Sequence, residues 1–390
     1  MDVVFYIEIG GGGEAERGTA HVGSFGEREH ALSFARQIRQ AGYRPKFVVG
    51  PLIADHITRA GFEPAVFSSA DWGVELVKDI DPAMVIGCEL FNVSPESANG
   101  LMKLGVPIGT IDGTTLSHEI NTNPFDMPEY RRELVLPDHF YAFRPCPIND
   151  IGANTETVSY WSLFPDVSTT AKDPQRYAAL GLDAGRRTVL LPIAPWAIGS
   201  AFIFGLAGYY QTLVERIVDG LDAAGGDIDL VFISMFRPEA LTVERKNRVT
   251  VHYPGLIDYD NYDHLLRSCD AIVSDNIIQT SVSKAAMMGT PHLIVQNMRA
   301  SDMPYRYNMF PLKVLFPPDR DYAQIVDTAE YGEPDDIREK LIAILNQGYA
   351  DDGARTRRDA YRQRVAGLSQ PGQILEHILG RAAEARAAAQ

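Results

Sequence analysis

Cysteine is scarce in this chain. Only Cys88, Cys146 and Cys269 occur among 390 residues, and they lie far apart with no C-x-x-C pair. This spacing encodes neither a zinc knuckle nor a disulfide framework. It is typical of a protein from a reducing compartment, so we predict a cytoplasmic location.

Positive charge is also in short supply. Lysine and arginine total 36 against 51 aspartate and glutamate residues, which gives a formal net charge of −15. No basic block is concentrated enough to follow a phosphate backbone. Nucleic acid is therefore excluded as an expected partner.

Long apolar runs without breakers are missing. Residues 188–214, TVLLPIAPWAIGSAFIFGLAGYYQTLV, carry no charge and are long enough to span a bilayer. Pro192, Pro195 and Gly199 divide the run into a strand, a loop and a helix, so we expect no integral membrane segment. The opening MDVVFYIEIGGGG has an acid at position 2 and a short apolar run, which is typical of a first buried strand rather than a signal peptide.

The sequence is rich in short β-type runs that alternate with helical patterns. This alternation indicates βαβ units and parallel sheets, an α/β fold. We expect strands at Val3–Ile9, Pro45–Val49, Ala65–Phe67, Met84–Cys88, Ile108–Ile111 and Phe140–Phe143 in the first half, and in RRTVLLPIA, IDLVFISM, RVTVHYP, AIVSDN and PHLIVQN in the second. Helices are expected near residues 27–41, 52–60, 71–79, 94–104 and 201–223.

The alternation of strand and helix patterns occurs in both halves of the chain. It predicts two doubly wound, Rossmann-like domains facing a cleft. We place the first domain at residues 1–182, the second at 183–355 and a helical tail at 356–390. The polar stretch TTAKDPQRYAALGLDAGRR is the expected hinge. Ligands bind at the carboxyl ends of strands in such sheets, so functional residues are sought in the loops that follow them.

A glycine-rich loop, IGGGGEAERG, follows the first strand. Gly10, Gly12 and Ala15 match the G-x-G-x-x-A spacing of a dinucleotide site, but helical periodicity starts only near Glu27 and no acid follows the second strand. Thr19 stands where a P-loop needs lysine. A loop that closes over a ligand, or a plain surface turn, accounts better for these glycines.

The most informative stretch is CDAIVSDNIIQTSVSKAAMMGTPHLIVQN, residues 269–297. A strand ends near Ser274, a helix begins near Gln279, and Gly289-Thr290-Pro291 ends that helix before the next strand. Unpaired amides at the helix start are suited to bind a phosphate group, although the nearby hydroxyls could simply cap the helix.

This stretch resembles the donor-binding signature of the GT-B glycosyltransferases, the group of MurG and the UDP-glycosyltransferases. The preceding RVTVHYPGLIDYDNYDHLLRSCDAIVSDN resembles their loop over the nucleotide base, and QNMRASDMPYRYN their sugar-binding loop. The resemblance implies a donor site built from Gly199, Ser200, Arg237, Tyr253, Asp275, Asn276, Gln279, Thr280, Ser281, Lys284 and Asp302. Lys284 stands where relatives place a ribose-binding glutamate, and Ile277-Ile278 where they place Gly-Gly, so Lys284 is a candidate partner of a diphosphate.

A general base is expected on the first domain. Ser24 and Glu27 fit the capping box S-x-x-E, which is a sufficient structural role. SFGEREHALSFARQIRQAGY also resembles the S-x-G-E loop and helix of Kdo transferases, in which this glutamate is the base. Both roles of Glu27 stay open.

Histidines provide the competing bases. His21 with Asp112 is similar to the His-Asp dyad of UDP-glycosyltransferases, and His30 lies one turn into the helix. His118 is better placed as an acceptor-loop residue.

The resemblance implies an inverting, metal-independent glycosyltransferase that uses a nucleotide sugar as co-substrate and no other cofactor. Four aromatic residues, Trp161, Phe164, Trp196 and Phe202, suggest a small or partly apolar acceptor. The uncharged helix after Gly199 is a candidate cover for that acceptor or a contact in a homodimer. Two alternatives remain: a nucleotide-sugar 2-epimerase, and a non-catalytic relative that binds a nucleotide sugar.

Overall fold

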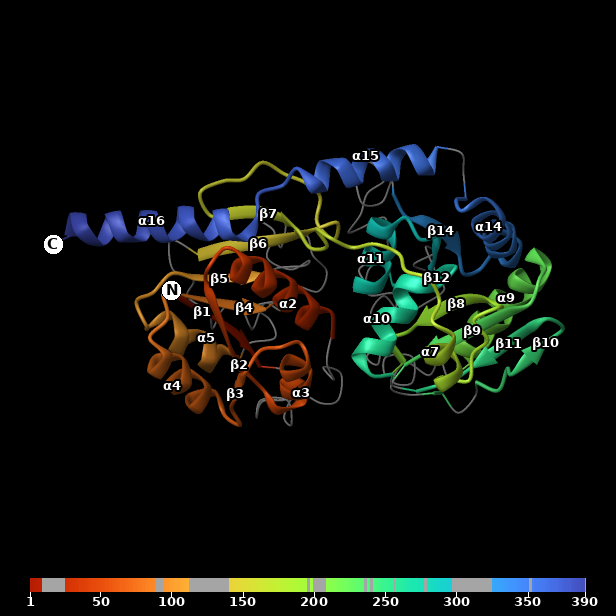
Figure 1. The fold of residues 1–390 in the computed structure, drawn as a ribbon, viewed down its shortest axis with the longest axis horizontal. Coiled ribbons are helices and arrows are strands. Elements are labelled where there is room, and N and C mark those ends of the chain that lie inside the picture. Colours follow the sequence, from red (N-terminus) through yellow and green to blue (C-terminus); the bar gives the residue numbers. More distant parts are fainter. Residues whose placement is uncertain are drawn as a thin grey trace. The chain divides into compact units, whose positions relative to one another are not determined.

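The structure is a computed structural model that describes residues 1–8, 25–88, 94–111, 140–194, 197–198, 208–234, 237–238, 241–255, 257–276, 279–296, 325–350 and 353–389. The chain divides into two compact units, shown in Figure 1. Unit 1 comprises Met1–Pro165 and Val365–Gln390, and unit 2 comprises Asp166–Arg364.

Unit 1 is a seven-stranded sheet in which every pairing is parallel, with the order β3-β2-β1-β4-β5-β6-β7. Its strands are β1 (Asp2–Ile7), β2 (Arg44–Val49), β3 (Pro64–Val66), β4 (Met84–Cys88), β5 (Ile108–Ile111), β6 (Phe140–Cys146) and β7 (Val158–Ser162). Its helices are α2 (Phe25–Gln40), α3 (Pro51–Arg59), α4 (Ala70–Ile80), α5 (Pro95–Met102) and α16 (Pro371–Ala389).

Unit 2 also has a seven-stranded sheet, with the order β10-β11-β9-β8-β12-β13-β14, and among its described pairings only the short β10–β11 pair is antiparallel. Its strands are β8 (Arg187–Pro192), β9 (Ile228–Ile233), β10 (Arg245–Lys246), β11 (Val249–His252), β12 (Ala271–Ser274), β13 (His292–Gln296) and β14 (Asp327–Glu330). Its helices are α7 (Pro174–Ala179), α9 (Tyr209–Ala224), α10 (Tyr259–Ser268), α11 (Thr280–Met288), α14 (Pro334–Gln347) and α15 (Ala354–Ala366).

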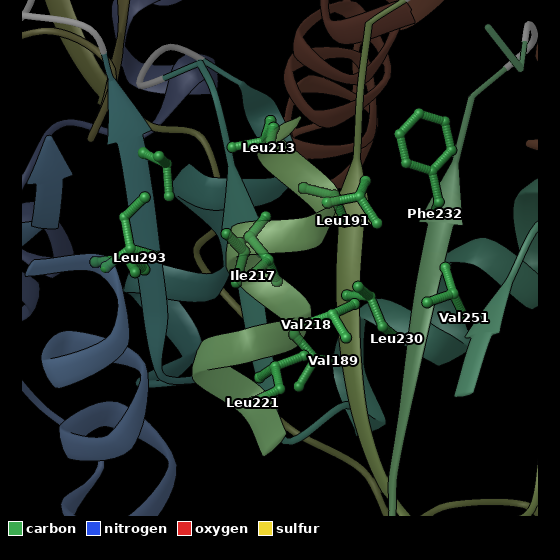
Figure 2. Packing of buried hydrophobic residues seen from close by; sticks show 14 of the residues in the cluster. Val189, Leu191, Leu213, Ile217, Val218, Leu221, Leu230, Phe232, Val251 and Leu293 are labelled. Carbon is green, nitrogen blue, oxygen red and sulfur yellow. The ribbon is translucent and has the colours of Figure 1, made fainter. Parts of the chain in front are cut away.

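The core of unit 2 lies between its sheet and α9. Figure 2 shows Leu213, Ile217 and Val218 of α9 against strand side chains such as Leu191 and Leu230. All five are at most 1% exposed, so each stabilises the unit by roughly 1.5–3 kcal/mol through apolar burial. Strands enclosed on both faces carry continuous apolar runs, and the runs VLLP of β8 and LVFI of β9 therefore identify these strands in the sequence.

The α/β fold and most of the expected strands are confirmed, with boundaries shifted by a few residues. Three strands went unpredicted, β7, the two-residue β10 and β14. The expected helix near 201–223 is α9, which begins at Tyr209 among the described residues.

The units divide the chain after Pro165, whereas the sequence suggested a boundary after residue 182. Residues 166–182 belong with unit 2 because two of their side chains bond to residues just before β12. Lys172 forms an ion pair of 2.6 Å with Asp270, and the Tyr177 hydroxyl lies 2.9 Å from that of Ser268. The tail also divides differently, since Val365 and the residues after it belong to unit 1.

The three cysteines are buried and free of disulfides. Within the described residues, no helix is both long enough and apolar enough to cross a bilayer.

Candidate functional site

The carboxyl edge of the unit 2 sheet contains a topological switch point. From β8 the chain moves outward through β9 to β11, then returns to place β12 on the other side of β8 before continuing to β13 and β14. Neighbouring connections therefore leave the sheet on opposite faces between β8 and β12. Such a point is the usual ligand site of an open parallel sheet.

The turn from β12 into α11 is fixed by its own side chains. The Ser274 hydroxyl donates to Oε1 of Gln279 at 2.5 Å and accepts from the amide of Asn276 at 3.1 Å. Gln279 occupies the N-cap without a side-chain bond to the helix. Among the described residues, nothing hydrogen-bonds the amides of Thr280 and Ser281, and amides in the first turn of a helix are suited to bind an anion.

Two predicted phosphate ligands on α11 are already engaged by α10. The Ser281 hydroxyl bonds to the hydroxyl of Tyr262, and the ammonium of Lys284 forms an ion pair with Asp263. The Lys284 side chain is only 13% exposed. In this arrangement the two side chains hold α10 against α11, and their hydroxyl and ammonium groups do not lie open to a ligand.

Asp275 follows β12 directly at the switch point. Its Oδ2 accepts a hydrogen bond of 2.9 Å from the hydroxyl of Tyr210 on α9, while its Oδ1 is enclosed and has no hydrogen-bond partner in the described part of the chain. Burial raises the pKa of the Asp275 carboxyl to about 6, although the bond from Tyr210 opposes the shift. A carboxyl group at this pKa exchanges its proton close to neutral pH.

Arg237 and Tyr253 form a stack beyond the ends of β9 and β11. The guanidinium carbon of Arg237 lies 3.8 Å from the centroid of the Tyr253 ring, and its Nε donates to the carbonyl of Leu241 at 3.0 Å. The Tyr253 hydroxyl donates to the carbonyl of Val243 at 2.5 Å, and burial raises its pKa to about 12. Arg237 itself is exposed, so the stack presents a flat cationic face to solvent.

Glu27, the first candidate base, lies in the opening turn of α2. The helix begins at Phe25, which makes Glu27 its third residue, the spacing that the capping-box interpretation requires. The side chain of Glu27 is outside the described part of the structure. His21, Asp112, Gly199, Ser200 and Asp302 also lie outside the described residues, so their assignments remain predictions.

His30 is enclosed in unit 1. It is 4% exposed, and within the described ranges neither ring nitrogen has a hydrogen-bond partner. Burial lowers its pKa to about 4, which keeps the imidazole neutral but makes it a weak base. The structure thus places His30 in the packing of α2.

Glu8 is a residue of interest that the sequence analysis missed. It follows β1 at the switch point of the first sheet, where β1 lies beside β4. It is 6% exposed, and its Oε2 accepts from the amide of Ser94 at 2.6 Å. The feature of the sequence that could have identified Glu8 is a single acidic residue within the otherwise apolar stretch VVFYIEIG.

The aromatic residues proposed as acceptor contacts are not exposed where they are described. Trp161 is fully buried, and its ring packs edge-on against Phe34 at 5.0 Å between centroids. Phe164 is 8% exposed. They belong to the core of unit 1 because β7 and α2 close around them, whereas Trp196 and Phe202 lie outside the described residues.

Solved structures with the same architecture cover almost the whole chain. Spinosyn forosaminyltransferase SpnP aligns with a TM-score of 0.62 and 14% identity over 98% of this chain and 99% of its own. Glycosyltransferase VinC in complex with dTDP aligns with a TM-score of 0.59 and 13% identity over 98% and 100%. A putative UDP-N-acetylglucosamine 2-epimerase from Listeria monocytogenes reaches 0.56 and 12% identity over 95% and 92%. The fold is that of the GT-B glycosyltransferases.

At the level of sequence, comparison with curated proteins gave no match. A family model described as a family of unknown function, DUF6365, matches residues 34–306, more than half of the chain and parts of both units. The chain is therefore a member of the DUF6365 family, with a GT-B fold.

Proposed function

We propose that this protein is a glycosyltransferase that moves a sugar from a nucleoside diphosphate donor to a small-molecule acceptor. The observation that carries the proposal is the switch point of unit 2, where α11 begins after Asp275 with the amides of Thr280 and Ser281, which no described residue hydrogen-bonds. Helix amides are suited to hold the diphosphate leaving group. The GT-B fold, shared with a transferase bound to dTDP, supports this assignment.

The nucleoside would lie toward Arg237 and Tyr253. They follow β9 and β11, on the opposite side of β8 from the α11 amides, and their stacked faces suit an aromatic base. Gly199, Ser200 and Asp302 complete the proposed donor site. Lys284 would act indirectly, by holding α10 to α11 through Asp263.

The acceptor and the base would belong to unit 1. We assign Glu27 as the base that removes the acceptor proton, because a carboxylate in the first turn of a helix stays ionised. The His21 and Asp112 dyad is the alternative. The acceptor class suggested by SpnP is a natural product, and the transfer would be inverting and independent of metal.

The first test is calorimetric binding of UDP, dTDP, GDP, ADP and CMP to the full chain, repeated with Arg237→Ala. We expect one nucleotide to bind selectively and Arg237→Ala to weaken it by about tenfold, the loss of one stacking contact. Glu27→Gln should bind this nucleotide normally and lower kcat by about 10²–10⁴-fold with a competent acceptor. Binding of NADH in place of every nucleotide would refute the proposal.

The second candidate function is a nucleotide-sugar 2-epimerase. It is favoured by the fold shared with the Listeria protein over 95% of this chain. Such an enzyme would convert its nucleotide sugar without any acceptor. Incubation of the chain with nucleotide sugar alone, followed by NMR, separates the two activities.

A further inference from the structure

Asp275 is a buried acidic residue at the start of the proposed phosphate site. It lies at the switch point, on the turn that leads to the amides of Thr280 and Ser281 at the start of α11. One carboxyl oxygen accepts a hydrogen bond from the Tyr210 hydroxyl, and the other is enclosed and has no partner among the residues that the structure describes. An ionised carboxylate here would repel the phosphate groups that the amides attract.

The groups that face Asp275 do not relieve this repulsion. Tyr209 and Tyr210 of α9 are the neighbouring titratable groups, and Tyr209 is in turn surrounded by Arg216, Tyr331 and Glu330. Lys284 of α11 forms an ion pair with Asp263 of α10. Among the described residues, no cation acts on the Asp275 carboxyl.

We propose that Asp275 is a positioning residue that is protonated when a nucleoside diphosphate sugar is bound, so that the donor site carries a neutral acid beside the diphosphate. The inference rests on the proposed function. Binding and protonation are then linked, because a ligand that favours the neutral acid draws a proton onto it.

The sign of the linkage follows from the pKa of Asp275. In the free protein burial raises this pKa to about 6, and a bound diphosphate raises it further. Below pH 6 the free protein already holds the proton, and affinity is at its maximum. Above pH 6 the proton must be taken up on binding, so affinity falls by up to about tenfold per pH unit until the pKa of the complex is passed.

The experiment is calorimetry of the full chain with dTDP-glucose, UDP-glucose, GDP-glucose and ADP-glucose between about pH 5.5 and about pH 8.5. These diesters have no phosphate proton that titrates in this range, unlike free nucleoside diphosphates. Each titration is run in two buffers with different heats of ionisation, which reports the protons taken up. We expect uptake of a fraction of one proton per ligand near neutral pH and a decline in affinity above pH 6.

Two variants assign the effect to Asp275. Asp275→Asn keeps the shape and a hydrogen-bond donor but cannot ionise, so its affinity should not change with pH and no proton should be taken up. Tyr210→Phe removes the bond that stabilises the carboxylate, so the decline should move to higher pH. Tyr210→Phe also keeps the test valid if Asp275→Asn fails to fold.

The outcomes separate the inference from the function on which it rests. Binding of a nucleotide sugar without proton uptake, at an affinity independent of pH, would overturn the role of Asp275 and leave the transferase proposal intact. So would a decline that persists unchanged in the Tyr210→Phe variant. Failure of all four nucleotide sugars to bind at any pH would overturn the proposed function and this inference together.

Discussion

The ammonium of Lys284 forms an ion pair with Asp263, and both side chains are more than three-quarters buried. Removing one partner of such a pair leaves a buried charge without compensation and destabilises the fold. Removing both partners leaves no such charge, so part of the stability is recovered. Lys284→Met should therefore lower the free energy of unfolding of unit 2 by about 1–3 kcal/mol, and the Lys284→Met/Asp263→Asn double variant should recover about half of that loss. Denaturant unfolding of the unmodified chain, the single variant and the double variant measures this recovery.

Nucleotide affinity distinguishes this role from direct contact with a diphosphate. A residue that holds α10 to α11 should change affinity by less than about threefold when it is replaced, whereas loss of a charged phosphate contact costs about tenfold or more. A large fall in affinity in both the single and the double variant would show that Lys284 leaves Asp263 and binds the ligand.

Single residues were predictable where the chemistry is local. The turn through Ser274, Asp275 and Asn276 and the helix start at Gln279 are legible because strand end, polar turn and helix cap follow one another directly. The partners of Ser281 and Lys284 were not, since Tyr262 and Asp263 lie about twenty residues earlier and reach them only when α10 packs on α11.

The C-terminal helix α16 packs closely on α2 through a glycine. A Cβ added at Gly372 would lie 2.3 Å from the Cβ of Ala41, whereas one added at Gly380 in the same helix would meet nothing within 4 Å. Gly372→Ala should therefore destabilise unit 1 by about 1–3 kcal/mol through the forced shift of α16. Thermal unfolding, followed by hydrogen exchange in α2, measures the effect.

Gly380→Ala is the matched control. It makes the same chemical change in the same helix without a clash, so helix propensity should raise stability by up to about 1 kcal/mol. Equal effects of the two substitutions would mean that α16 does not need the close approach at Gly372.

Elements were predictable where burial imposes a pattern. The strand β8 contains a continuous apolar run, but β14, with the sequence DTAE, has none. β14 is a strand because it pairs with β13 and because Asp327 is satisfied by the buried guanidinium of Arg358, which lies 2.6 Å away and 31 positions later. Only tertiary structure supplies those partners.

At the scale of the whole molecule, the two repeats of βαβ units were clear in the sequence, but the limits of the units were not. The polar segment 166–182 looks like a linker because its composition is hydrophilic, yet Lys172 and Tyr177 attach it to unit 2. The tail is similarly ambiguous, since α16 joins unit 1 through contacts with α2, more than 300 residues earlier in the chain.

The division into two units gives a direct test of where a nucleotide binds. A ligand at 100 times its dissociation constant stabilises the unit that holds it by about 2.7 kcal/mol, which slows exchange of amides that open only on unfolding of that unit by about a hundredfold. Hydrogen exchange with dTDP or UDP should therefore protect the core strands β8, β9 and β12 of unit 2, while β1 and β2 of unit 1 change little. NADH is the control ligand, because a dinucleotide site in the glycine-rich loop after β1 would protect unit 1. Protection concentrated in β1 and β2 with either class of nucleotide would move the site to unit 1 and contradict the assignment of unit 2 as the donor-binding half.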